Sequence, residues 1–486
     1  MAYRYGKRKQ MMFLPESIEH YVPSDCPVRA YDAFVDALDF RELGIFLNPC
    51  KVGNAQYDPK AMLKLLVYSY SYGVKGSRKI ERETHNNLTY LWLMGGLKPD
   101  HKTIAEFRRK NKKALAKVLK QCARMCLKLD LIAGNVLFID GTKIRANAAR
   151  SRTHEKAYYE QQLSKIDERI EQLLEECEAI DQEEQHLGSY VSMNKELSKA
   201  ENLKRRIEAV LEEFKETDRT VINQTDPDCA VMHSTSGSHA SYNVQIVVDD
   251  QHGLIVQADA VSDTSDYNQF SPQIAQAEQT LGEPCEVACA DAGYADTDDL
   301  GKVDSLGTRV IVPSQRQALH EEESLFSKGH FTYNRDNNCY VCPEGHCLRF
   351  AGIDRPTGKR HYLITDKKLC HQCRYYGQCT TAKNGRKIIR LRNEALKEKL
   401  EAHYEEPESQ EIYRRRKSRV EHPFGHIKRN LKTDGFLLRG GSGVQAETSV
   451  LATCFNVVRM ITIFGGVRGL IKRLSALTAP PGWVTT

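Results

Sequence analysis

Two short apolar runs, each ending in an aspartate, constrain the fold of this chain more than any other feature. The segments NVLFID at 135–140 and EVACAD at 286–291 end in Asp140 and Asp291, and a turn-like segment that contains glycine follows each. Apolar runs of this length between turn residues indicate buried strands. We therefore expect both aspartates at strand ends of an α/β core, where aspartates also commonly act as helix caps or turn formers.

The segments between and beyond these runs complete a mixed sheet. Apolar stretches at 242–250 and 254–261 are separated by the short turn DQHG, which predicts a β-hairpin. A helix is expected over 272–281 and a further strand over 308–314. Strand, hairpin, helix and two more strands together indicate an α/β fold.

A strongly acidic segment interrupts this core at 155–218. It carries 18 Asp and Glu against 9 Lys and Arg, a local charge of −9, so the formal net charge of +6 leaves +15 on the remainder. A basic body fits a polyanionic partner such as DNA. The segment also has a heptad-like seam, which predicts a helical, coiled-coil hairpin, with apolar positions at Tyr159, Leu163, Ile166, Ile170, Leu173, Cys177 and Ile180.

The first 130 residues are expected to be mostly helical, because apolar residues recur there at helical spacing. Asp100, followed by Thr103 and Glu106, marks a helix start. Basic side chains accompany these helices, and Arg78, Arg108 and Arg109 are candidate DNA contacts. A solvated helix surface is the alternative interpretation of each.

Six cysteines fall between Cys339 and Cys379, a clustering that indicates metal binding rather than a disulfide framework. Two CxxC pairs about 30 residues apart suit a structural zinc ion held by four thiolates. The alternative is a set of reduced cysteines in a small β-rich insertion. Six candidates exceed the four ligands that such a zinc ion takes, and they are Cys339, Cys342, Cys347, Cys370, Cys373 and Cys379.

A third acid, Glu421, lies in a strongly basic helical stretch at 393–432. At about 100° per residue, Lys417, Glu421 and Lys428 share one helical face. Pro423 removes a backbone donor and should kink or restart this helix. Glu421 is either a surface ion-pair partner or a metal ligand among cations that hold phosphate. Two aspartates and a glutamate supply the hard oxygen ligands that two magnesium ions need for phosphoryl transfer.

The set FIDGTKIRANAAR, YNVQIVVD, ADAGY and VEHPFGHIKR resembles transposases of bacterial insertion sequences. The upstream segments YDPKAMLKLLVYSYSYG, SRKIE and PDHKTIAEFRR resemble the helical N-terminal region of those enzymes, so the resemblance spans nearly the whole chain in the expected order. It implies the DDE class with an RNase H-like core, and catalytic acids at Asp140, Asp291 and Glu421. CPEGH around Cys342 and the cysteines downstream of it also resemble these transposases. The resemblance therefore favours Cys342, Cys370, Cys373 and Cys379 as the zinc ligands, with Cys339 and Cys347 as their rivals.

The resemblance further implies a Tyr-(2)-Arg-(3)-Glu-(6)-Lys signature around the third acid. Tyr413 and Arg416 fit its first spacing, and Glu421 and Lys428 fit its last. Four residues instead of three separate Arg416 from Glu421, and Lys417 has the family's spacing. Helical phase favours Lys417 for the arginine's role, and Lys428 is a phosphate contact.

The sequence therefore predicts a DNA transposase that binds terminal inverted repeats and, with two magnesium or manganese ions, cleaves and joins DNA strands as a homodimer on DNA. The alternatives are a zinc-containing DNA-binding regulator derived from a transposase, and an RNase H-like nuclease without strand transfer. The start of the chain has no apolar run long enough for a signal peptide, and Asn456 and Arg459 interrupt the apolar stretch at 450–467, which favours a buried helix over a membrane span. A bacterial cytoplasmic, nucleoid-associated location is expected.

The expected domains follow from these segments. They are a helical DNA-binding domain (1–130), the first part of the RNase H-like core (131–154 and 219–329), the acidic hairpin (155–218), the zinc-ribbon-like insertion (330–385), the C-terminal part of the core with the basic helix (386–475) and a tail (476–486).

Overall fold

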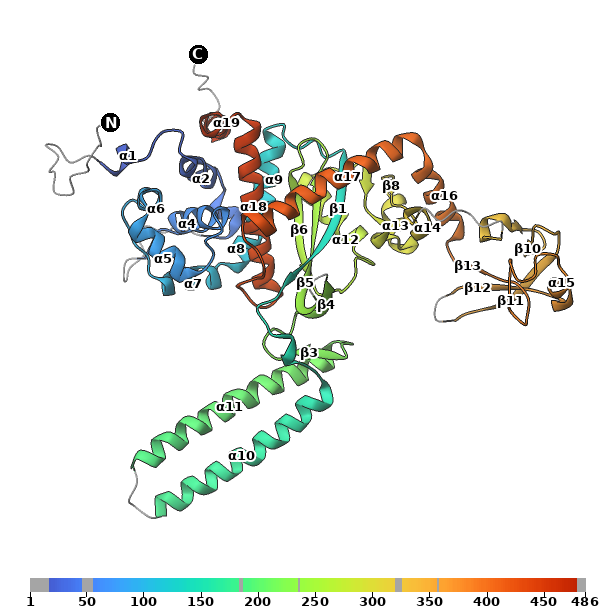
Figure 1. The fold of residues 1–486 in the computed structure, drawn as a ribbon. Helices are drawn as coiled ribbons and strands as arrows, with labels where there is room; N and C mark the ends of the chain where they lie inside the picture. The colour runs from blue at the N-terminus through green and yellow to red at the C-terminus, as the bar shows by residue number, and fades with distance from the viewer. Residues whose placement is uncertain are drawn as a thin grey trace, which may run out of the picture. The chain divides into compact units, whose positions relative to one another are not determined.

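The computed structural model of this chain describes residues 17–45, 56–182, 187–234, 237–319, 326–355 and 358–478, with side chains at 177–194 left out (Figure 1). The chain forms two compact units. The first contains Met1–Asp266, Ala275–Pro284 and Lys417–Thr486, and the second contains Tyr267–Ile274 and Cys285–Arg416. The end of the expected tail, beyond residue 478, and the side chains of Cys177 and Ile180 lie outside the described residues.

Short helices build the N-terminal part of the first unit, as predicted. Asp100 caps one of them by accepting a hydrogen bond from the backbone amide of Thr103 at 2.7 Å, which confirms the expected helix start. Asp58 caps another helix through the amide of Lys60. The helices are α1 (Ile18–Tyr21), α2 (Pro27–Asp36), α3 (Phe40–Leu43), α4 (Pro59–Ser71), α5 (Ser77–Asn86), α6 (Leu88–Leu93), α7 (His101–Lys110), α8 (Lys112–Ala116) and α9 (Val118–Lys128).

An antiparallel sheet forms the centre of the first unit. Its long strand β5 (Gly237–Asp249) pairs along one edge with β1 (Val136–Arg145). The other edge of β5 pairs with β4 (Ala230–Ser234) and then with β6 (Ile255–Val261). The β5–β6 pair is the predicted hairpin, and Gly253 in its turn has a φ of +67°, a left-handed conformation that glycine adopts without strain.

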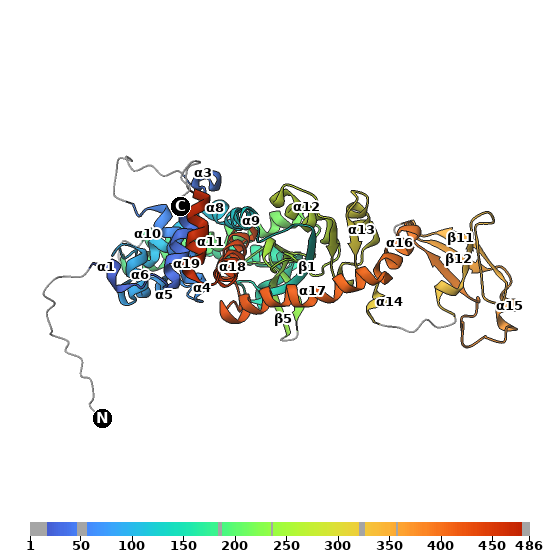
Figure 2. The same ribbon diagram turned by 90° about the horizontal axis from the view of Figure 1, so that it is seen from above.

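The predicted buried helix is α18 (Gly441–Ile463), which packs against β6, α4, α8 and α9 (Figure 2). It is long and apolar enough to cross a membrane by length and composition alone, but 72% of its most apolar window is buried inside the protein. Asn456, which interrupts the apolar run, is fully buried and exchanges hydrogen bonds with the backbone of Ile255. These observations identify α18 as a core helix, and its Asn456 side chain hydrogen-bonds to the backbone of strand β6. The following helix, α19 (Val467–Thr478), packs against α2.

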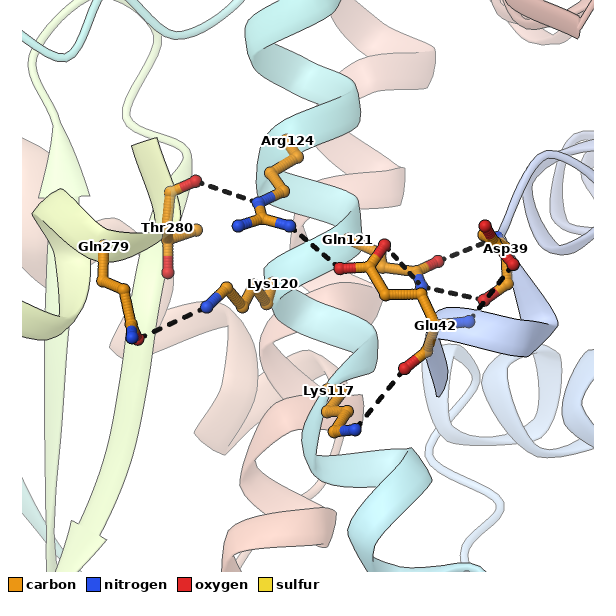
Figure 3. A network of polar contacts seen from close by, with 8 residues as sticks. All are labelled: Asp39, Glu42, Lys117, Lys120, Gln121, Arg124, Gln279 and Thr280. Atoms are coloured by element: carbon orange, nitrogen blue, oxygen red, sulfur yellow. Dashed lines mark hydrogen bonds and ion pairs between the residues drawn. The ribbon is translucent and has the colours of Figure 1, made fainter. Parts of the chain in front are cut away.

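One face of α9 fastens the N-terminal helices to the rest of the first unit (Figure 3). Gln121 exchanges two hydrogen bonds of 2.9 Å with the backbone of Asp39. Arg124 reaches both ways, donating to the Glu42 carboxylate at 2.9 Å and to the carbonyl of Thr280 at 3.2 Å. Thr280 lies on α12 (Phe270–Leu281), the helix predicted at 272–281. These contacts join three segments that are distant in sequence.

The acidic segment forms two long helices, α10 (Lys156–Gln182) and α11 (Leu187–Glu216), which contact each other and project from the sheet (Figure 1). A two-stranded ladder of β2 (Thr153–Glu155) and β3 (Val221–Asn223) closes their base. Tyr159 is buried there, and its hydroxyl donates toward the carbonyls of Ile222 at 2.7 Å and Arg152 at 3.1 Å. The described seam residue Leu173 is also fully buried.

The second unit begins with a pair of parallel strands, β7 (Val287–Cys289) and β8 (Arg309–Ile311). Its helices are α13 (Thr297–Asp304), α14 (Gln315–Ala318) and α16 (Glu394–Glu405), with the first part of α17 (Pro407–Gly425). Arg309 ties β8 to α17 through Glu408 at 2.6 Å. Antiparallel and parallel strands occur together with many helices, so the chain has a mixed α/β fold.

The cysteine-rich segment forms its own antiparallel sheet in the second unit. The strand order is β13 (Lys387–Arg390), β12 (Arg360–Ile364), β11 (Cys347–Ile353), β10 (Cys339–Val341) and β9 (Thr332–Asn334). A small helix, α15 (Lys367–His371), follows β12. One face of the sheet carries a hydrophobic core of Phe331, Tyr340, Leu348, Tyr362, Ile364 and Ile388.

Candidate active site

Asp140 lies in the middle of a strand, so the prediction that it ends one is wrong. β1 continues through the GTK segment to Arg145 because Gly141, Thr142 and Lys143 pair in register with Gln245, Val244 and Asn243. Successive side chains in a strand alternate between faces, so Asp140 and Thr142 share one face. The Asp140 carboxylate is half-buried and accepts a 2.9 Å hydrogen bond from the amide of Gly141.

Lys428 lies beside Asp140 in the first unit. Its ammonium donates to the Thr142 hydroxyl at 2.5 Å. Burial lowers the pKa of Lys428 below its usual value, although the Asp140 carboxylate raises it. Sequence reasoning missed Thr142 because GTK was interpreted as a turn. The signal available was its position two residues beyond Asp140, on the same face of an extended strand.

The helix that carries the third acid does not break at Pro423. Instead α17 runs from Pro407 to Gly425 and widens into a π-helical turn, η4 (His426–Asn430), which carries Lys428. A proline inside a helix removes one backbone hydrogen bond, and the wider turn follows within one helical turn of it. An adjacent apolar face holds it in place, with buried side chains at Val420, Phe424, Ile427 and Leu431. Phe424 and Ile427 line an apolar cavity with Ile144 of β1.

Glu421 is exposed, with 64% of its side chain accessible, and its carboxylate lies 3.9 Å from the ammonium of Lys417. Neighbouring His422 and His426 both contact the ring of Phe455 edge-on, at 5.4 and 5.5 Å between centroids. Burial lowers the pKa of both imidazoles, which favours their neutral forms. The two histidines therefore pack against α18, and Glu421 presents its oxygens to solvent.

Asp291 belongs to the second unit, two residues after β7. It caps the short turn η2 (Ala292–Tyr294) by accepting from the amide of Gly293 at 2.8 Å. Its carboxylate lies 4.0 Å from the guanidinium of Arg416, whose side chain is only 14% exposed. Arg416 also covers the ring of Tyr413 at 5.6 Å, and burial raises the pKa of that tyrosine. The two candidates for the arginine role therefore have different partners: Arg416 contacts Asp291, and Lys417 contacts Glu421.

The three acids are divided between the units, with Asp140 and Glu421 in the first and Asp291 in the second. The boundary between the units falls inside helix α17, because Arg416 lies in the second unit and Lys417 in the first. Within each unit an acid is matched by a cation from α17 or its π-helical extension. The Arg416 guanidinium lies 4.0 Å from Asp291, and the Lys428 ammonium binds Thr142 on the face of β1 that carries Asp140.

A polar cluster on the other face of β1, which sequence reasoning missed, supports the position of Asp140. Asp266 accepts hydrogen bonds from the side-chain amides of Asn243 at 2.9 Å and Gln245 at 2.7 Å. A Cβ at Gly141 would lie 2.4 Å from the Asp266 oxygen and 2.5 Å from the Gln245 nitrogen. A larger residue at position 141 would therefore have to displace the side chains of Asp266 and Gln245. The available signal was two amides at alternate positions of an otherwise apolar strand.

Four cysteines line one small cavity of about 40 Å³ in the second unit. They are the favoured set, Cys342, Cys370, Cys373 and Cys379. Backbone amides point at two of the sulfurs, from His346 to Cys342 at 3.3 Å and from Arg386 to Cys370 at 3.4 Å. Across the described residues, however, no group of three or more His, Cys, Asp or Glu side chains has the geometry to hold a metal ion. The thiols thus share a cavity without converging on a point.

The rival cysteines lie apart from this cavity. Cys339 and Cys347 occupy strand positions that alternate with the core residues Tyr340 and Leu348, so they face away from the core. Burial and a contact with the Cys347 thiol raise the pKa of Cys339. They therefore form a separate pair on the opposite face of the sheet.

The basic residues of the N-terminal helices divide into buried and exposed ones. Arg108 is buried, with 6% exposure, and donates to the carbonyl of Lys75 at 2.8 Å and the Tyr70 hydroxyl at 3.2 Å, so its prediction as an exposed DNA contact is wrong. Arg109 is exposed and forms a two-pronged ion pair with Glu106. Arg78 is exposed on α5.

Comparison with known families gives two matches at opposite ends of the chain. Residues 341–461 match a family described as "Transposase DDE domain", and residues 16–110 match one described as "Transposase domain (DUF772)". The first match contains Glu421, Lys428 and the four cysteines of the cavity, and the second contains Arg78 and Arg109. Asp140 and Asp291 fall between the two. No curated protein matches the chain.

Proposed function

We propose, from the premise that these two matches support an insertion-sequence transposase of the DDE type, that the chain binds terminal inverted repeats and cleaves and joins DNA strands at a site with Asp140, Asp291 and Glu421 as its acids. The observation that carries the proposal is that cations lie at two of the acids. The Arg416 guanidinium lies 4.0 Å from Asp291, and the Lys428 ammonium binds Thr142, which shares a strand face with Asp140. Carboxylates accompanied by cations suit a reaction at a phosphodiester, because the cations hold phosphate oxygens while the acids bind metal.

The donor set fits magnesium or manganese. All three groups are carboxylates, which these hard cations prefer, and the side chains of Glu421 and Asp291 are 64% and 38% exposed. Two bound ions would supply neutralisation of the charge that develops on the scissile phosphate. The chain's own contribution is positional. Thr142 holds the Lys428 ammonium beside Asp140, and Tyr413 supports the Arg416 guanidinium that faces Asp291.

The remaining assignments extend this proposal. The core is RNase H-like, α10 and α11 form a coiled coil, and the domain boundaries are those expected from the sequence. The N-terminal helices, with Arg78 and Arg109 on their surface, bind the inverted repeats. Because two transposon ends are cut and joined, the protein acts as a homodimer on DNA, in the bacterial cytoplasm and with the nucleoid.

A structural zinc ion is proposed for the four-cysteine cavity. The shared cavity and the two amides directed at sulfur are features that thiolate ligands need, since hydrogen bonds to coordinating sulfurs orient them. Four cysteine thiolates are a ligand set that structural zinc ions take in proteins.

The test is cleavage of a labelled duplex carrying the element's end in magnesium or manganese. Wild type is compared with Asp140→Asn, Asp291→Asn and Glu421→Gln, which keep side-chain size and remove the charge. Glu411→Gln is the matched control, because Glu411 is an exposed residue of the same helix that pairs only with Arg414 among the described ion pairs. We expect wild type and the control to cut at the element boundary, and the three acid variants to bind without cutting. Cleavage by any acid variant at the wild-type rate would remove that residue from the site.

A further inference from the structure

The cysteine subdomain, residues 326–390 with 356–357 outside the described part, is strongly basic. It contains 13 Lys and Arg against 4 Asp and Glu, a formal charge of +9 in 65 residues. The net charge of this segment exceeds that of the whole chain, whose formal net charge is +6. A small sheet does not need such an excess for folding, since like charges repel in the compact state.

Part of this charge has an internal role. Arg386 donates to the carbonyls of Phe326 at 2.8 Å and Cys379 at 3.1 Å. Arg390 donates to the Tyr340 hydroxyl at 2.9 Å and covers the ring of Tyr333 at 4.0 Å. Arg374 pairs with Glu344 at 2.9 Å. These three arginines bind the subdomain's own groups, so they do not account for the surplus on its surface.

The outer face of the subdomain's sheet carries cations in register. Arg349 on β11, Leu363 on β12 and Lys387 on β13 form one cross-strand row. They alternate with core residues such as Leu348, Tyr362 and Ile388, so the row points away from the core. Arg349 and Lys387 are exposed, and two strand spacings put them about 10 Å apart.

Two of the subdomain's four acids have partners of their own. Asp366 caps α15 by accepting from the amide of Lys368 at 2.9 Å, which leaves the exposed side chains of Lys367 and Lys368 beside it. Glu344 is already paired with Arg374. Glu344 and Asp366 are therefore engaged with groups other than Arg349 and Lys387, and the segment keeps its excess of nine positive charges.

We propose that the outer face of the cysteine subdomain, defined by Arg349, Leu363 and Lys387, binds the phosphate backbone of DNA as a second contact surface besides the N-terminal helices. The inference rests on the proposed function, which supplies DNA as the partner. The positive charges of Arg349 and Lys387 are attracted to phosphates of any sequence, so we expect this surface to add affinity without adding sequence preference.

The experiment measures the salt dependence of DNA binding by the full chain. Fluorescence anisotropy gives the affinity for a labelled duplex with the element's end, and for a random duplex of equal length, over a series of salt concentrations. The Arg349→Ala/Lys387→Ala variant removes two phosphate contacts, so we expect the slope of log affinity against log salt to become shallower by about two on both duplexes. The charge-preserving Arg349→Lys/Lys387→Arg variant should keep the wild-type slope, which separates loss of charge from misfolding.

The matched control removes the same charge from the acidic hairpin. Lys195 and Lys199 are exposed on α11, and Lys195→Ala/Lys199→Ala should leave the slope unchanged. A wild-type slope in Arg349→Ala/Lys387→Ala would overturn the inference while leaving the proposed function intact. An equal loss of slope in the control would show general charge dependence and would also overturn it. Failure of the wild-type chain to bind either duplex would overturn both proposals.

Discussion

Replacing Gly141 by alanine should destabilise the first unit, because the residue after Asp140 has no room for a methyl group. The new Cβ would lie 2.4 Å from the Asp266 oxygen and 2.5 Å from the Gln245 nitrogen, closer than carbon approaches either atom. Those two atoms hydrogen-bond to each other at 2.7 Å, and Asn243 adds a second bond at 2.9 Å. To admit the methyl group Asp266 must move, and both bonds are then lost.

The expected loss in the free energy of unfolding follows from the two hydrogen bonds to Asp266. A hydrogen bond to a charged group contributes about 1.5–3 kcal/mol. Asp266 is half-buried, so hydrogen bonds from water replace part of the two lost bonds. We therefore expect a total loss of about 3 kcal/mol in the free energy of unfolding. Urea unfolding followed by circular dichroism measures this loss, and cleavage should fall with it because Asp140 is the neighbouring residue.

Two further variants make the reasoning refutable. In an Asp266→Ala background the obstruction is gone, so Gly141→Ala should cost clearly less than in wild type, which a double-mutant cycle measures. Gly425→Ala is the matched control. Gly425 is in helical conformation with nothing within 4 Å of its Cβ position, so alanine should be neutral or stabilise by up to about 1 kcal/mol. If Gly141→Ala unfolds at the wild-type urea midpoint, or Asp266→Ala brings no relief, the close contact is refuted.

Three other predictions follow from buried groups. Arg108→Met should lower the urea midpoint by more than Arg109→Met, because only Arg108 leaves buried hydrogen-bond partners behind; equal midpoints would contradict this. Cys370→Ser should abolish one equivalent of zinc in the purified protein, measured by mass spectrometry, and Cys347→Ser should not. Burial raises the pKa of Glu447 above its usual value, so the unfolded state releases that proton first and stability should fall as pH rises from about 4 toward the raised pKa. Glu447→Gln should flatten that fall in unfolding curves recorded across pH, and an unchanged slope would refute the assignment.

Local patterns in the sequence were sufficient where neighbours in sequence decide the structure. The β5–β6 hairpin followed from two apolar runs and a short turn, and the helix start at Asp100 followed from the capping residue. The buried helix α18 was predictable because Asn456 and Arg459 are too polar for a membrane span. In each case the determining residues lie within a few positions of one another.

Where residues distant in sequence determine the structure, prediction from the sequence was wrong or absent. Arg108 belongs to a helix with an exposed basic face, and its burial depends on Tyr70 and on the carbonyl of Lys75, more than 30 residues earlier. The strand through Asp140 continues because β5, about 100 residues later, supplies a partner for each residue of a segment with turn-like composition. Neither partnership leaves a local pattern. The candidate acids themselves came from family resemblance, and their joint action stays a prediction.

The ladder between β2 and β3 also has an evolutionary consequence. Thr153 pairs with Asn223 and Glu155 with Val221, so the two ends of the helical hairpin meet about 5 Å apart at this ladder. A segment whose ends meet in this way can be gained, lost or resized without moving the strands on either side. Related chains can therefore differ by this whole hairpin and keep the same sheet, and a variant with residues 156–220 replaced by a tight turn would test this in the laboratory.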